Sequence, residues 1–193
     1  MARTLAFNKE DILDKVTKLF WLKGFNGTSM QDLVEVTRLN RSSIYNTFGS
    51  KEELYQAALS HYLSKNQDHF KPAVNATSNY KKAIRAIFES YLDEITTDKD
   101  QKGCMTIGCL TEMGNQNTTI AEWLSHNDQQ MQKIFGTLVQ KGKESGEIIT
   151  TIETPILTNY LISSFQGLRV RGMSITDRKT LQGIINTIMN AIH

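Results

Sequence analysis

A short segment near the N-terminus combines two regularly spaced apolar residues with a run of hydrogen-bonding side chains. It reads Arg41-Ser42-Ser43-Ile44-Tyr45-Asn46-Thr47-Phe48. Ile44 and Phe48 are four residues apart, a spacing at which helical side chains share a face, so they predict a buried side. The other side chains are almost all hydrogen-bonding groups and include no acid. Because phosphates repel carboxylates, this polar face favours a nucleic acid partner over plain solvation of a short helix.

Roles for this polar face follow from the reach of each side chain. Arg41, at the start of the helix, can make a bidentate contact to guanine or bind a phosphate. Ser42 and Ser43 are short, so the backbone can approach the base edges closely. Tyr45 and Asn46 have the length and the donors for phosphate or base contacts. We therefore expect these five residues to bind DNA.

Phosphate contacts are expected at the starts of the neighbouring helices. Lys51 and the free amides around it begin one helix, and Thr28 and Ser29 begin another. Residues 36–51 are basic and contain no acid, in a chain whose net charge is only +2. A local cationic face on a nearly neutral protein suits a polyanion, although a solvated basic turn explains the charge alone equally well.

Caps and apolar spacing predict the helices that position these side chains. Asn8 caps a first helix that ends at Gly24, and its apolar stripe has a helical period. The stripe consists of Ile12, Leu13, Val16, Leu19 and Phe20. Thr28 or Ser29 caps a second, short helix, and Asn40 caps the third. Two short helices joined by a tight turn form a helix-turn-helix, whose second helix lies in the major groove.

All later segments also read as helices. Ser50 caps a fourth helix, which we expect to stop near Pro72. Apolar spacing predicts further helices at Tyr80–Thr96, Thr106–Gly114, Thr119–Ser145, Thr154–Val170 and Asp177–Ile192. No segment reads convincingly as a strand, so the predicted fold is all-α. We expect a helix-turn-helix DNA-binding domain at residues 1–50 and a ligand-binding and dimerisation domain, a helical bundle, at residues 51–193.

Composition predicts a cytoplasmic protein that is not an enzyme. Apolar residues make up 39% and charged residues 22% of the 193 residues, which is ordinary for a soluble globular chain. The N-terminus lacks the apolar core of a signal peptide, and no apolar run approaches the ~20 residues of a membrane span. The histidines lack metal-ligand spacing, and no phosphate-binding loop or nucleophile elbow is present. We therefore expect no cofactor, no metal and no catalytic site.

Several motifs follow one another between Ile12 and Leu59. They include Phe20-x3-Gly24-Phe25, Thr28-Ser29-Met30-x-Asp32-Leu33 and the pattern Tyr45-x2-Phe48-x2-Lys51-x2-Leu54. In these motifs the sequence resembles the TetR family of bacterial repressors. The resemblance implies a three-helix DNA-binding head, a connecting fourth helix, and a C-terminal domain that dimerises and usually holds an effector pocket. It also implies repression, and it adds one DNA contact, Gln31, to Arg41, Ser42, Ser43, Tyr45 and Lys51.

Arg38 departs from the family pattern, which commonly has glycine in the turn between the second and third helices. If the backbone there is left-handed, a residue other than glycine costs about 1 kcal/mol. Arg38 then either offsets this cost by binding a phosphate or weakens the turn.

The last two predicted helices are the best candidates for a dimer interface. Their apolar faces consist of Ile156, Leu157, Tyr160, Leu161, Ser164, Phe165 and Leu168 in one helix and Leu181, Ile184, Ile185, Ile188, Met189 and Ile192 in the other. Paired with their symmetry mates, two such helices would form a four-helix interface, although the same stripes also suit a core within one chain. A homodimer would place its two heads on DNA half-sites ~34–36 Å apart.

A pocket for a small-molecule effector is expected among the middle helices. Its candidate lining residues are Phe88, Tyr91, Leu92, Cys109, Met113, Trp123, Asn127, Phe135 and Phe165. An aromatic cavity with a few polar groups suits a mainly apolar molecule. Each of these residues also fits plain core packing, and the sequence does not identify the ligand.

Cys104 and Cys109 raise the question of a redox sensor, since an accessible thiolate reacts with oxidants and electrophiles. The two are five residues apart, which is about 140° around a helix, so they do not share a face. Gly103 and Gly108 beside them favour close helix packing instead. We expect buried, inert thiols.

Together these features predict a homodimeric transcription regulator that binds a palindromic operator and is released by an effector. An activator, or a regulator that needs no effector, fits the same residues. The alternative from another class is a helical bundle that binds a ligand or a protein without specific DNA binding, and only Arg38 favours it.

Overall fold

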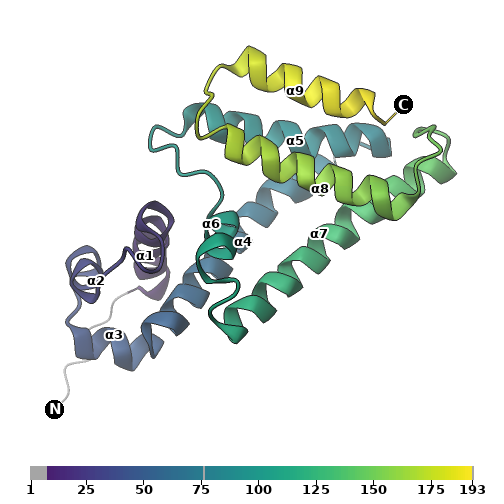
Figure 1. Cartoon of the computed structure of the whole chain (residues 1–193). Coiled ribbons are helices and arrows are strands. Elements are labelled where there is room, and N and C mark those ends of the chain that lie inside the picture. Colours follow the sequence, from purple (N-terminus) through teal and green to yellow (C-terminus); the bar gives the residue numbers. More distant parts are fainter. Residues whose placement is uncertain (1–7, 76, 193) are drawn as a thin grey trace. The chain divides into compact units, whose positions relative to one another are not determined.

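The computed structural model describes residues 8–75 and 77–192, with the backbone alone for residues 66–75. Throughout this range the regular elements are helices, which confirms the all-α prediction (Figure 1). They are α1 (Lys9–Lys23), α2 (Met30–Thr37), α3 (Arg41–Phe48), α4 (Lys51–Asn75), α5 (Tyr80–Thr97), α6 (Met105–Met113), α7 (Thr118–Glu144), α8 (Thr154–Arg171) and α9 (Arg178–Asn190).

The helices pack into two compact units, and each unit takes two separate stretches of the chain. The first unit is Met1–Lys65 with Met105–Ala121, and the second is Asn66–Cys104 with Glu122–His193. The helix α6 therefore packs with the N-terminal helices although it lies in the middle of the sequence. A functional boundary at residue 50 stays a prediction, because packing and DNA recognition are separate criteria for a domain.

The core of the first unit is built around aromatic rings. Phe20 from α1 meets the edge of Tyr55 from α4, with ring centroids 4.9 Å apart, and Phe25 lies 5.2 Å from the same ring. Leu33 from α2 and Ile44 from α3 are buried as well. The short helices α2 and α3 are thus anchored by apolar side chains, while α1 packs against α2 and α2 against α3.

The second unit has a core formed by α5, α8 and α9 with part of α7. In Figure 1, α9 runs alongside α5, and α8 lies next to both. Polar side chains join α5 to α9 along their length. The pairs are Arg85 with Asn186 at 2.8 Å, Glu89 with Gln182 at 3.2 Å, and Asp93 with Arg178 at 2.5 Å. Since the numbers rise on one helix as they fall on the other, α5 and α9 run antiparallel.

The helix α4 is predicted to stop near Pro72. It ends at Asn75, less than one helical turn further on. A proline removes one intrahelical hydrogen bond and crowds the carbonyl four residues earlier. In the last turn of a 25-residue helix that loss does not end the helix at the proline itself.

The turn between α2 and α3 has the left-handed conformation that glycine adopts most easily. Arg38 caps the C-terminus of α2 with φ 61° and ψ 18°, and its N–H donates to the Val34 carbonyl. The geometry of the turn is therefore kept with an arginine in place, at the steric cost of a side chain in this region.

Arg38→Gly is expected to raise the free energy of unfolding by about 1 kcal/mol, because it removes the left-handed strain. Arg38→Ala is the matched control, since it loses the same charge but keeps a Cβ, and it should give no such gain. Urea unfolding of the three proteins measures both values. Equal stability of the two variants would contradict the strain at this turn.

Candidate nucleic-acid interface

The helix α3 has one buried and one exposed side. Asn40 caps its start, where the side-chain oxygen accepts a hydrogen bond from the Ser43 N–H at 2.8 Å. Ile44 and Phe48 are buried and anchor the helix in the first unit. The other side chains are exposed or half-buried: Arg41, Ser42, Ser43, Tyr45, Asn46 and Thr47. The acid-free polar face predicted from the sequence therefore lies at the surface of the helix.

A reciprocal cap fixes the start of α2. The Ser29 hydroxyl accepts from the Asp32 N–H at 3.1 Å, and the Asp32 carboxylate accepts from the Ser29 N–H at 2.8 Å. The ammonium of Lys23 binds the same carboxylate at 2.7 Å. The bond from Lys23, followed by those from Ser29, holds the pKa of Asp32 well below its usual range. This carboxylate is therefore ionised and engaged within its own unit.

Two predicted contacts on and before α2 are placed very differently. Thr28 is fully buried, and its hydroxyl donates to the Gly24 carbonyl at 2.7 Å. A buried hydroxyl that is already bonded fixes the loop before α2 and is poorly placed to reach a phosphate. Gln31, in the first turn of α2, is exposed.

Lys51 begins α4 and lies over an aromatic ring. Its Nζ is 4.3 Å from the centroid of the Phe25 ring, which is within the range of a cation–π contact. The helix start is fixed by Ser50 and Glu53, whose side chains accept hydrogen bonds from each other's N–H at 3.1 and 2.7 Å. The predicted DNA contacts therefore all belong to the first unit. They lie at the starts of α2 and α4 and along the exposed side of α3.

Five of the predicted effector-pocket residues form part of the core of the second unit. They are Phe88, Tyr91, Leu92, Phe135 and Phe165. The ring of Phe165 meets Phe88 and Tyr91 edge-on, with centroids 5.6 and 4.9 Å apart. These rings pack on one another, which is the arrangement of a closed core.

The other predicted pocket residues fall in both units. Trp123 and Asn127 are half-buried on the part of α7 that belongs to the second unit. Cys109 and Met113 are buried on α6, in the first unit. Whether these residues line one pocket with the aromatic cluster stays a prediction.

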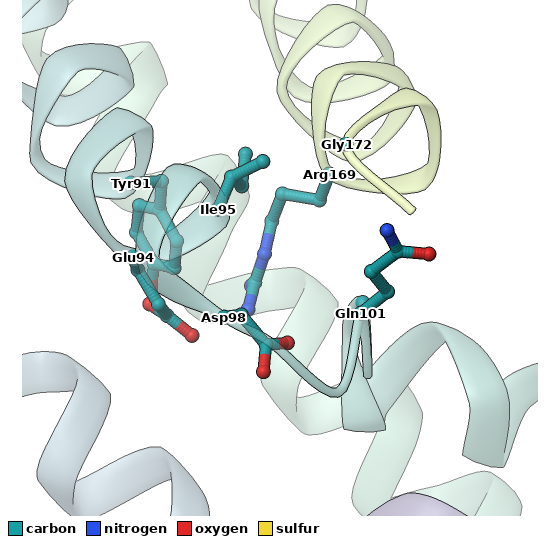
Figure 2. A pocket seen from close by; sticks show the side chains of 8 residues that line it. Tyr91, Glu94, Ile95, Asp98, Gln101, Arg169 and Gly172 are labelled. Carbon is teal, nitrogen blue, oxygen red and sulfur yellow. The ribbon is translucent and has the colours of Figure 1, made fainter. Parts of the chain in front are cut away.

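A small polar cavity in the second unit was not predicted from the sequence. It has a volume of ≈ 10 Å³, which is room for about one water molecule. Arg169 is buried beside it, with its guanidinium 4.2 Å from the centroid of the Tyr91 ring. Figure 2 shows Arg169 reaching from α8 toward the side of the cavity where Asp98 lies. The full lining is Tyr91, Glu94, Ile95, Asp98, Gln101, Gly103, Arg169 and Gly172.

Comparison with known families covers both ends of the chain. Residues 12–58 match the bacterial regulatory proteins of the tetR family, and residues 81–188 match the tetracyclin repressor-like C-terminal domain. The chain belongs to the TetR family. It is a helix-turn-helix transcription regulator and not an enzyme, as the resemblance of its N-terminal motifs indicated.

Individual relatives are similar along all or nearly all of their length. YezE of Bacillus subtilis (strain 168), an HTH-type transcriptional regulator, is 24% identical over 193 residues, which is 100% of both chains. The HTH-type transcriptional repressor ComR of Escherichia coli (strain K12) is 24% identical over 188 residues, covering 97% of this chain and 90% of ComR. A cysteine-substituted form of the TetR-family regulator CifR, in complex with 26-bp double-stranded operator DNA, superposes with a TM-score of 0.88. It is 21% identical and covers 99% of this chain and 100% of its own, so this likeness shows the shared fold.

Both cysteines of this TetR-family protein are buried and free of disulfide bonds. Cys109 is fully buried on α6, next to the hydroxyl of Tyr55, and burial raises the pKa of its thiol. Burial, together with Cys109 beside it, also holds the pKa of Tyr55 far above its usual range. Cys104 precedes α6 and belongs to the other unit. The surroundings of Cys109 support the expectation of an inert thiol.

In the part of the chain that the structure describes, no group of three or more His, Cys, Asp or Glu residues is arranged to hold a metal ion. In the same residues, no helix combines the length and the apolar character needed to cross a membrane.

Cys109 is expected to resist alkylation by iodoacetamide at neutral pH, because the thiolate is the reactive form and burial disfavours it. Leu110→Cys provides the control, since Leu110 is 54% exposed on the same helix and a thiol there should react quickly. Peptide mass spectrometry after timed alkylation, with and without urea, follows each thiol. Equal labelling of the two positions in the folded protein would contradict the inert assignment.

Proposed function

We propose that this TetR-family protein is a homodimeric repressor whose paired α3 helices enter successive major grooves of a palindromic operator. The observation that carries the proposal is the polar side of α3, which is exposed, contains no acid and is anchored by two buried residues. Its relatives ComR and DhaR are named transcriptional repressors, and CifR binds double-stranded operator DNA. A regulator of this kind acts on the chromosome, so we place it in the cytoplasm.

The DNA contacts divide by their chemistry. Arg41 lies at the start of α3 and is exposed, so it is suited to read a base edge with its planar guanidinium. Lys51 lies at the start of α4, where a backbone phosphate would meet both the ammonium and the free amides of a helix N-terminus. Tyr45 is 46% exposed on α3, which leaves its ring and hydroxyl available to the DNA. Thr28 contributes by fixing the loop before α2.

The dimer is proposed to form through α8 and α9. On α8, Ile156 and Tyr160 are 60% and 40% exposed, and Val170 continues the same apolar face. A Cβ at Gly167 of α8 or at Gly183 of α9 would have no atom within 4 Å. Glycine destabilises a helix interior by about 1 kcal/mol relative to alanine, so a glycine without a neighbour in its own chain suits close approach by another chain.

The effector is proposed to bind in the second unit. The aromatic cluster there is closed, and the neighbouring cavity holds about one water molecule. A larger ligand that binds at this cavity has to separate the helices around it. Such a ligand would favour the separated form and shift the population toward it. If that form spaces the two heads differently, DNA is released, to an extent limited by the difference in ligand affinity between the two forms.

The test of the proposed function is selection of bound sequences from a random pool of double-stranded DNA by the purified protein. A palindrome should be enriched, because a symmetric dimer reads two inverted half-sites. Arg41→Ala should weaken binding by about 1–3 kcal/mol and relax the preference at one position of each half-site. Lys51→Ala should weaken binding to all sequences alike. If no sequence is enriched at low salt, a helical bundle that binds a ligand or a protein without DNA specificity replaces the repressor.

Gly167→Leu should raise the dissociation constant of the dimer at least tenfold while stabilising α8 itself. Leucine improves helix propensity, and its Cβ would have no atom of its own chain within 4 Å, so we expect the loss to arise at the partner chain. Gly108→Leu on α6 makes the same change at a glycine that also has no atom within 4 Å, and it should leave the dimer intact. Analytical ultracentrifugation over a range of protein concentrations measures the dimer dissociation constant of each variant. A wild-type dissociation constant for Gly167→Leu would rule out this surface as the interface.

A further inference from the structure

A carboxylate on α6 binds the backbone of the loop that leads into α2. Glu112 accepts a hydrogen bond from the Phe25 N–H on Oε2 and from the Asn26 N–H on Oε1, both at 2.7 Å. These groups are 87 and 86 residues apart in the sequence and belong to the same compact unit. A charged acceptor makes each of these bonds stronger than one between neutral groups.

The loop is shaped to receive this carboxylate. Gly24 has φ +72°, and a Cβ built on it would lie 2.7 Å from Oε2 of Glu112. Glycine at this position therefore allows both the left-handed backbone and the close approach of the carboxylate. Beyond the loop, Thr28 binds the Gly24 carbonyl and Ser29 caps α2. The two bonds from Glu112 to Phe25 and Asn26, here called the clamp, therefore act on the backbone that begins the helix-turn-helix.

The residue held by the clamp is also the one that supports Lys51. The Phe25 ring is buried, and it lies 5.2 Å from Tyr55 and 6.5 Å from Phe20. Its face carries the Lys51 ammonium at 4.3 Å from the centroid. Glu112 fixes the backbone of Phe25, neighbouring rings fix its side chain, and the ring restricts where the ammonium can lie.

We infer that Glu112 is a positioning residue for DNA binding, which acts through Phe25 to hold the Lys51 ammonium where a backbone phosphate is bound. This inference rests on the proposed function, because it takes Lys51 to be a phosphate contact. The change in DNA affinity that it predicts is opposite to the change that charge alone predicts. A carboxylate in a DNA-binding unit repels phosphates, so charge alone predicts that its removal strengthens binding. Positioning predicts that removal weakens binding.

The experiment measures operator affinity against salt concentration for the full-length protein and its variants. Each phosphate contact contributes about 0.9 to the slope of log affinity against log salt, so Lys51→Ala should lower the slope by about that amount. Glu112→Gln removes the charge and places an amide NH₂ against one of the two N–H donors. It should weaken binding severalfold and lower the slope toward that of Lys51→Ala. The double variant should bind no more than about twofold more weakly than Lys51→Ala alone.

Two further variants separate positioning from charge and from folding. Glu35→Gln removes an exposed carboxylate from α2 in the same unit and should bind as tightly as the wild type or more tightly. Phe25→Leu leaves the backbone clamp and an apolar side chain in place but removes the aromatic face. It should lower the slope as Lys51→Ala does, because it breaks the link from Phe25 to Lys51 through which Glu112 is inferred to act. This link is tested even if Glu112→Gln fails to fold.

The inference is overturned by any of three results. The first is that folded Glu112→Gln binds the operator as tightly as the wild type or more tightly. The second is that the losses of affinity from Glu112→Gln and Lys51→Ala multiply in the double variant. The third is that Phe25→Leu keeps the wild-type slope of log affinity against log salt. Failure of the proposed function looks different, because the wild-type protein itself would then show no operator to bind.

Discussion

The DNA-binding unit depends on keeping two very short helices folded. The helices α2 and α3 have eight residues each, and isolated helices of this length do not persist in water. Three local devices compensate: side-chain caps at Ser29 and Asn40, the buried anchors Leu33 and Ile44, and the tight turn at Arg38. Each device uses only the inner side or the ends of a helix. The residues on the outer side of α3 are therefore not needed to keep the helix folded, so they can vary to suit DNA contacts.

The N-terminal helices were predicted well because their signals are local. Asn8, Ser29 and Asn40 cap helices within three residues of their own position, and Gly24 and Gly49 end them, so a reader of the sequence sees every part of the signal.

The parts that sequence reasoning missed are contacts between distant residues. Glu112 binds two amides more than 80 residues away, and an exposed-looking glutamate in a helix gives no sign of this. Arg169 reads as a surface charge at the end of α8, yet it is buried over Tyr91 from α5. The burial of Thr28 was missed as well, although its hydroxyl binds a carbonyl only four residues away. A threonine before a helix suits a phosphate contact and a contact within the loop equally well. In each case the residue type is compatible with two roles and only the fold selects one.

The placement of α6 limits how this protein can be recombined with its relatives. The first unit is completed by residues 105–121, which supply Glu112 to the loop at Phe25 and Cys109 to the hydroxyl of Tyr55. In a chimaera that joins only the N-terminal helices to the effector domain of a relative, the relative's α6 would pack against these surfaces. Exchange of the DNA-binding unit therefore requires a graft of two separate segments, the N-terminal helices and α6.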